Sequence, residues 1–253
     1  MRRGWGWSAV LAAAALWLSC GPGGAGGAGG AGNNNNDDAT VMLFSGRDIW
    51  RNGAFAYGGF ITAPGGFDDD GLMLKVLLSG GLYRYSAGDL GGERIIGAEG
   101  TAQVLPGFRI KRFGVEAKIF FGLDFERHKL WPDDPGNRLQ GTDLGLRFAA
   151  EFWTEPTPKT MIAASMSLSS IATSNSARLA YGWRVCEDIF EDGFYVGPEA
   201  QYFGAEGYRH LRLGIHITQL KAENYEWSAG LGFARASDGA SGPYVHIGFT
   251  VRQ

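Results

Sequence analysis

The stretch Gly114–His128, GVEAKIFFGLDFERH, decides the fold of this chain. Every second residue in it is apolar: Val115, Ala117, Ile119, Phe121, Leu123 and Phe125. Successive side chains of a strand point to opposite faces, so the stretch predicts a ribbon with one apolar and one largely charged face. Soluble strands average about 5–6 residues, whereas a tilted strand that crosses a bilayer needs about 9–11. This length and pattern favour a barrel wall with lipid outside and polar groups inside.

A single ribbon of this kind also fits the edge of a large soluble sandwich, so recurrence of the pattern decides between the two. The alternation returns in 143–153, 210–220, 227–233 and 245–251. We therefore predict an all-β fold, an antiparallel up-and-down transmembrane β-barrel of about 12 strands. The expected strands lie near 41–50, 53–63, 71–86, 93–105, 114–128, 141–154, 159–172, 176–187, 192–205, 208–220, 225–236 and 243–252.

Turn chemistry separates the expected strands. Examples are Pro64-Gly65-Gly66, Pro106-Gly107, the Pro132–Asn137 segment and Pro156-Thr157-Pro158. An even number of antiparallel strands places both chain ends at the same end of a barrel, so the 129–140 and 237–242 loops are expected at the opposite end.

Composition excludes several function classes. The formal net charge is −3, which leaves no electrostatic footprint for nucleic acid. The mean hydropathy of −0.11 is too low for a helical membrane protein but suits a barrel, which hides its apolar half by alternation. The 41 glycines and 13% aromatic residues fit closely packed strands with interfacial rings. Cys20 and Cys186 lie far apart, so no disulfide framework is implied.

The N-terminal region predicts export. Residues 1–20 carry Arg2 and Arg3 before a short apolar core, the form of a signal peptide. The residues around Cys20 are compatible with lipoprotein processing that acylates this cysteine, and ordinary cleavage nearby is the alternative. Residues 21–39, rich in Gly, Ala and Asn, are expected to form a disordered tether, which leaves 40–253 for the barrel.

Several segments resemble the bacterial cellulose biosynthesis protein family BcsS. They are FSGRD at 44–48, GAFAYGG at 53–59, LLSGGLYRY at 77–85, LWPDDPGNR at 130–138, EPTP at 155–158, SSIAT at 169–173, SAR at 176–178 and AYGWR at 180–184. The resemblance spans roughly 43–251. It implies a part in cellulose production or export at or near the outer membrane of Gram-negative bacteria. Outer-membrane lipid, a glucan chain and the cellulose synthase machinery are the implied partners; the family carries over no reaction or catalytic residue.

Charged residues of both signs alternate with the apolar positions and are expected to face the lumen. The candidates are Glu116, Lys118, Asp124, Asp143, Arg147, Glu151, Arg178, Arg184, Glu199, Arg212 and His216, and the same alternation adds Lys75 and Glu99. They either contact a sugar polymer or pair with one another in a closed lumen. Barrels of about 8 strands are filled by side chains and those of 16–18 hold a channel, so a count near 12 leaves both alternatives open.

The longest loop offers a second candidate site. Trp131, Asp133, Asp134 and Asn137 could stack against and hydrogen-bond a glucan, or Trp131 could belong to the interfacial aromatic belt beside an ordinary turn. We expect the aromatic girdles to include Tyr83, Tyr85, Trp153, Tyr181, Trp183, Tyr202 and Trp227.

Signals for catalysis are weak. Carboxylates on adjacent strands could form a glycosidase pair, but barrels bring some together by chance. The four histidines show no metal-ligand spacing, and no cofactor motif is present. We predict a non-enzymatic outer-membrane barrel that assists cellulose export or anchoring. The alternatives are a barrel enzyme acting on glucan or lipid, and a structural barrel with an outward recognition loop.

Overall fold

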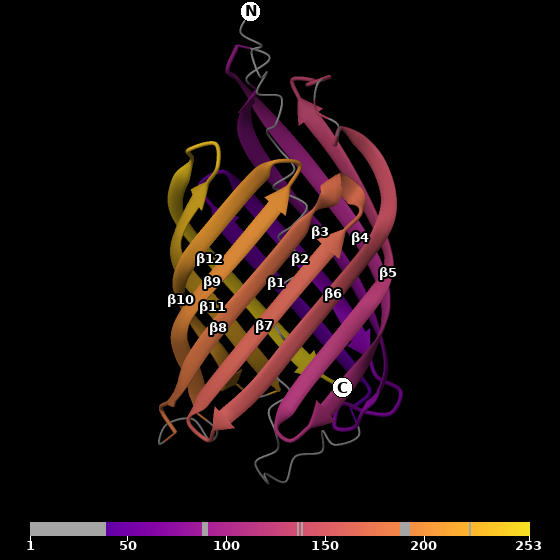
Figure 1. Ribbon diagram of the computed structural model, residues 1–253, viewed down its shortest axis with the longest axis vertical. Helices are drawn as coiled ribbons and strands as arrows, with labels where there is room; N and C mark the ends of the chain where they lie inside the picture. The colour runs from indigo at the N-terminus through magenta and orange to yellow at the C-terminus, as the bar shows by residue number, and fades with distance from the viewer. Residues whose placement is uncertain (1–38, 88–90, 136, 138, 188–192, 223) are drawn as a thin grey trace, which may run out of the picture.

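The computed structural model describes residues 39–87, 91–135, 137, 139–187, 193–222 and 224–253. The predicted signal peptide, Cys20 and the tether up to residue 38 lie outside this part. Within it, antiparallel strands β1 to β12 follow one another around one closed barrel, and β1 pairs with β12 to complete the ring (Figure 1). The predicted up-and-down barrel is confirmed, including its 12 strands.

The described strands are β1 Val41–Trp50, β2 Gly53–Thr62, β3 Gly71–Ala87, β4 Glu93–Arg112, β5 Val115–Trp131, β6 Gly141–Thr157, β7 Thr160–Ser169, β8 Asn175–Val185, β9 Phe194–Ala205, β10 Tyr208–Ala222, β11 Tyr225–Ala236 and β12 Ser241–Arg252. A short 3₁₀ segment, η2 Ile171–Thr173, lies between β7 and β8. Among the described residues, no helix is long and apolar enough to cross a membrane.

The two faces of each strand differ sharply in chemistry. In β5, Phe121 and Leu123 point outward and are 55% and 54% exposed, whereas Asp124 and Glu126 point inward and are fully buried. Large apolar side chains are exposed in the same way on the other long strands. The outward face of the wall is therefore largely apolar, while the interior holds most of the charged side chains together with buried apolar ones such as Phe44, Leu77 and Phe120.

The wall is uneven in height. Strands β3 to β6 have 17 to 20 residues, while β1, β2 and β7 have 10 each. The described chain ends meet where the Val41 and Gln253 main chains bond to each other; we call this the terminal end. The other end, the distal end, carries the 132–140 and 237–240 loops, as expected, and there the β3–β5 wall stands above its neighbours (Figure 1).

One expected break is in fact continuous strand, and a second is shorter than expected. β4 runs through Pro106-Gly107 to Arg112, and β6 runs to Thr157 with a register shift after Thr154. Proline lacks the N–H that the ladder needs. The β4–β5 pairing accordingly skips residues 105 and 106, while the β3–β4 pairing continues through both. Gly122 makes this possible, because a Cβ there would lie 2.1 Å from the Val104 carbonyl oxygen.

This contact predicts that Gly122→Ala destabilises the barrel by about 1–3 kcal/mol, because the added methyl group overpacks a rigid ladder. Gly100→Ala is the matched control, since a Cβ there would meet its nearest neighbour, the Ser79 carbonyl oxygen, at 3.9 Å. Urea unfolding in detergent micelles, followed by tryptophan fluorescence, measures both. Equal midpoints for the two variants would contradict the assignment.

Candidate functional site: the polar interior

The structure places all of the predicted lumen residues on the inward face. Most are buried, including Glu116, Lys118, Asp124 and Arg147. Asp143, which pairs with Glu126 in the β5–β6 register, is half-buried toward the distal end. These side chains do not form one cluster. Most of them fall into three ionic groups at different places in the barrel, and Arg184 pairs separately with Glu155 at 3.2 Å.

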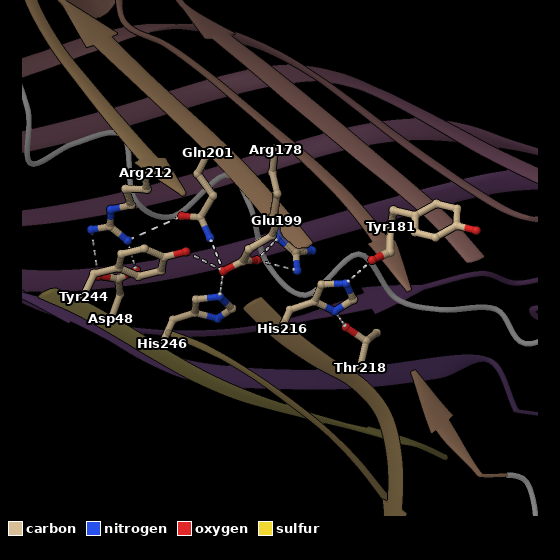
Figure 2. A network of polar contacts seen from close by, with 10 residues as sticks. All are labelled: Asp48, Arg178, Tyr181, Glu199, Gln201, Arg212, His216, Thr218, Tyr244 and His246. Atoms are coloured by element: carbon tan, nitrogen blue, oxygen red, sulfur yellow. Dashed lines mark hydrogen bonds and ion pairs between the residues drawn. The ribbon is translucent and has the colours of Figure 1, made fainter. Parts of the chain in front are cut away.

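The first group centres on Glu199 of β9 (Figure 2). One carboxylate oxygen, Oε1, accepts hydrogen bonds from the Tyr244 hydroxyl at 2.8 Å, His246 Nε2 at 2.9 Å and Gln201 Nε2 at 3.1 Å. The other, Oε2, accepts from Arg178 Nε at 3.0 Å. Tyr244 and His246 belong to β12, so these bonds pass over β10 and β11. Glu199 is thereby a charged acceptor that ties three strands together.

Arg212 of β10 lies beside this group. Its Nη1 lies 2.8 Å from Oδ2 of Asp48 on β1, and its Nη2 lies 3.3 Å from Oδ1, a bidentate pair. The guanidinium carbon also lies 4.6 Å from the ring centroid of Tyr244 and 5.2 Å from that of Phe203. A planar cation that stacks on aromatic rings and pairs through both terminal nitrogens is held in one geometry.

The second group surrounds Arg147 of β6. Its guanidinium donates to Asp124 Oδ2 at 2.8 Å, to Ser167 Oγ at 2.8 Å and to Glu126 Oε1 at 3.1 Å. Ser169 donates to the same Asp124 oxygen at 2.7 Å. Arg147, Asp124 and Glu126 are all fully buried. Buried charges need this degree of pairing, because an unpaired one costs several kcal/mol, on the order of 3–5.

Glu99 stands apart from these bonds. Its carboxylate is buried and faces the Arg147 group, and neither oxygen has a hydrogen-bond partner in the described part of the chain. The described residues hold no group of three or more His, Cys, Asp or Glu side chains placed to bind a metal ion.

The third group crosses the lumen. Lys75 of β3 donates to Glu151 of β6 at 2.7 Å, and its ammonium lies 5.8 Å from the ring centroid of Phe44 on β1. Lys118 pairs with Glu116 at 2.9 Å. Strands β1 and β6 are nearly opposite each other in the closed order, so Lys75 lies between opposite walls. At this level, side chains fill the interior.

The long distal loop folds back onto the barrel. Asp134 is buried and accepts a hydrogen bond from the Tyr85 hydroxyl at 2.7 Å, and Asn137 Nδ2 donates to the same hydroxyl at 3.0 Å. Trp131 ends β5 on the outward face and is 46% exposed, and Asp133 is exposed. Of the predicted glucan-contact residues, Trp131 and Asp133 therefore remain open to a ligand, while Asp134 and Asn137 anchor the loop.

The expected girdle is wrong for Tyr83, Tyr85 and Trp153, which are buried inside the barrel. The alternation itself predicts this, because residues an even number of positions apart in a strand share a face. Tyr83 and Tyr85 therefore lie on the same face as Lys75, and Trp153 lies on the same face as Glu151. Trp183 and Trp227 do point outward. Proximity to a strand end was the misleading cue.

Arg109 closes the terminal end and was missed, because the expected strand stopped at residue 105. It is 1% exposed and donates to main-chain oxygens of the 63–70 loop: Gly66 at 3.0 Å, Asp69 at 3.0 Å, and Phe67. In the same loop, hydrogen bonds from the Lys111 N–H and the Arg112 guanidinium lower the pKa of Asp70 below its ordinary value. The loop is thus held across the barrel end by buried and exposed contacts.

Comparison with protein families matches residues 42–253 to cellulose biosynthesis protein BcsS. The chain belongs to the BcsS family. Comparison with curated proteins finds no significant match. Among solved structures, the family member is similar to a KdgM porin (8% identity, TM-score 0.46, 83% of this chain and 98% of the porin). It is also similar to the β domain of the Bordetella autotransporter BrkA (14% identity, TM-score 0.46, 85% of this chain and 100% of that domain). Neither likeness bears on function.

His216 has a specific partner in this BcsS-family barrel. Its Nε2 lies 3.1 Å from the Tyr181 carbonyl oxygen, and its Nδ1 lies 2.8 Å from the Thr218 hydroxyl. A carbonyl can only accept, so Nε2 carries the proton and Nδ1 accepts from Thr218. The ring reaches β8 from β10 by lying over Gly197, its register partner, which has no side chain in the way.

The Tyr181 carbonyl is available because of a proline. The Arg184 N–H donates to the carbonyl oxygen of Lys159, which directly precedes β7, so by alternation the main-chain groups of Tyr181 point to β9. The residue opposite is Pro198, which has no N–H to donate, and the β8–β9 pairing is interrupted there. His216 replaces the missing ladder donor, which makes it a structural residue.

This predicts energetic coupling between His216 and Pro198. His216→Ala should cost about 1–3 kcal/mol by leaving a buried carbonyl unpaired. In a Pro198→Ala background, whose restored N–H faces Tyr181, the same change should cost clearly less. A double-mutant cycle on urea unfolding midpoints measures the coupling, with Thr218→Val as the control that leaves the carbonyl bond intact. Additive losses would contradict this role.

The Arg147 group makes a second energetic prediction. Arg147→Met should destabilise the barrel by about 3–5 kcal/mol, because it leaves Asp124 and Glu126 buried without their cation. Arg127→Met, on the outward face of the neighbouring strand, should change stability by less than about 0.5 kcal/mol. The temperature at which the folded band disappears on semi-native gels measures the stability of each variant relative to wild type. A similar decrease for both variants would contradict the prediction.

Proposed function

We propose that this protein is an outer-membrane barrel that assists cellulose biosynthesis as a non-enzymatic anchor, with no open conduit for the polymer. Membership of the BcsS family supports the link to cellulose. The apolar exterior supports a membrane setting, because so many exposed large apolar side chains, among them Leu144 at 71% and Leu213 at 59%, are far more favourable against acyl chains than against water.

One observation carries the choice of anchor over conduit: ion pairs cross the lumen. Lys75–Glu151, Arg212–Asp48 and the bonds from β12 to Glu199 each join strands that are not neighbours. A glucan chain passing through would have to break these buried pairs, at a cost on the order of several kcal/mol each. The glucan is therefore expected to meet the outside of the closed barrel, where the exposed ring of Trp131 offers a stacking surface.

Planar-bilayer recording tests closure directly. The purified protein should show no steady ohmic current, and Arg109→Ala should behave alike, because releasing the 63–70 loop leaves the mid-lumen pairs in place. A porin reconstituted in the same bilayers is the positive control. A steady current through the wild-type protein would overturn the closed lumen and favour a conduit.

The enzyme alternative requires carboxylates that act on substrate. Glu116 is bound to Lys118, and Asp143 is half-buried near the distal end. We expect Glu116→Gln and Asp143→Asn to leave the amount and chain length of cellulose unchanged in cells that depend on the variant protein. Loss of the whole protein should lower cellulose output. If a variant protein folds and is present at normal levels but the amount or chain length of cellulose changes, the result would instead favour catalysis.

A further inference from the structure

Charge is segregated between the two faces of the barrel. Every Asp and Glu within the described strands alternates onto the inward face: Asp48, Glu93, Glu99, Glu116, Asp124, Glu126, Asp143, Glu151, Glu155, Glu199 and Glu226. The outward charges of the strands are all cations: Arg47, Arg84, Arg94, Arg112, Arg127, Lys129, Arg209 and Arg235. All of these except Arg112 lie toward the distal end. An outward strand face that carries cations and no acidic residue favours an anionic environment at one end.

The densest part of this surface is the outward face of the tall β3–β5 wall, where Arg84, Arg94, Arg127 and Lys129 gather; we call it the distal cationic patch. The register spreads them over six residue positions of β4, with Arg94 nearest the rim and Arg127, opposite Gly100, farthest from it. Arg84 pairs with Ile96, two residues along β4 from Arg94, and Ile96 pairs with Trp131 of β5. Lys129 and Arg127 occupy the next outward positions of β5 below Trp131.

A shallow, small-residue surface lies directly beside the patch. Lys129 pairs with Ala98 and Arg127 pairs with Gly100, so β4 offers little side-chain bulk between the flanking strands. A Cβ on Gly100 would find its nearest atom at 3.9 Å, so the surface there is open. The next outward residues toward the terminal end are apolar, with Phe125 41% exposed and Val104 46% exposed. Cations at the rim with apolar surface beneath form an amphipathic face.

Within the described residues, the patch cations are not neutralised by acidic side chains. In the described part of the chain, none of its four cations forms an ion pair; Arg84 donates to the Arg51 carbonyl oxygen, and Lys129 lies 5.0 Å from the Trp131 ring centroid. At the terminal end, by contrast, Lys111 pairs with Asp68 at 3.0 Å and Arg112 pairs with Asp70 at 2.7 Å. The distal cations are left for an external anion.

We propose that the distal cationic patch binds the phosphate groups of an anionic lipid in the leaflet at the distal end. The planar arginine forks match phosphate oxygens, Lys129 adds a point charge, and an acyl chain lies over Ala98 and Gly100. A lipid fits better than a soluble anion, because the patch continues into the apolar exterior. The proposal rests on the membrane setting proposed above. It also orients the barrel, with its chain ends away from the anionic leaflet.

The test uses the full chain purified in uncharged detergent and titrated with a bis-phosphorylated glycolipid. Binding is followed by tryptophan fluorescence and by native mass spectrometry. The variant Arg84→Gln/Arg94→Gln/Arg127→Gln/Lys129→Gln should bind at least about tenfold more weakly, since each cation near an anionic surface contributes about fivefold. The matched control, Lys111→Gln/Arg112→Gln/Lys159→Gln/Lys221→Gln, loses equal charge at the terminal end and should stay within about twofold of wild type.

Two further arms identify the ligand. The same glycolipid without its phosphates should bind the wild type at least about tenfold more weakly, and inorganic phosphate should not compete at millimolar concentration. A patch variant that binds like wild type, equal loss in the control, or equal binding of the dephosphorylated lipid would each overturn the proposal. Wild-type protein that stays monodisperse in detergent-free buffer would refute the membrane setting itself, which distinguishes the two failures.

Discussion

Closure of the sheet is the constraint on which everything else in this protein depends. The pairing of β1 with β12 leaves no strand edge, so each backbone N–H and C=O along the wall has a neighbour to bond. Once the ring is closed, every side chain has only two destinations, the outside or the lumen. Most of the exposed large apolar residues take the outside, and most charged residues share a narrow interior with a buried apolar cluster, where the majority of them pair.

That interior explains why the polar residues resemble a site without behaving as one. A carboxylate such as Glu199 accepts from four donors, and Arg147 is satisfied by two carboxylates and a serine. Groups so fully occupied have no capacity left for substrate unless the pairs break. The lumen is best understood as the packed core of the molecule, partly ionic and partly apolar. The surfaces available to partners are the exterior and the distal rim.

The backbone has irregular points, and each is matched by a neighbour. Pro106 interrupts the β4–β5 ladder, and Gly122 leaves room for the main chain there. Pro198 of β9 has no N–H for the Tyr181 carbonyl, and His216 of β10 donates to that carbonyl in its place. Such compensation shows why a proline inside a strand is tolerated here. It also shows that an inward histidine beside charged groups can serve the main chain, although chemical intuition assigns it to catalysis.

Alternation with a period of two predicts the barrel and the face of most strand residues, because this pattern is local and does not depend on which strands are neighbours. It placed the charges of 116–126 inside, and it contained the information that puts Tyr83 and Trp153 inside as well. The choice of polar partners became visible in the folded barrel: Lys75 with Glu151, Arg212 with Asp48, and Asp134 with Tyr85. Those partners depend on register and on ring closure, which join residues far apart in the chain, so no local pattern encodes them.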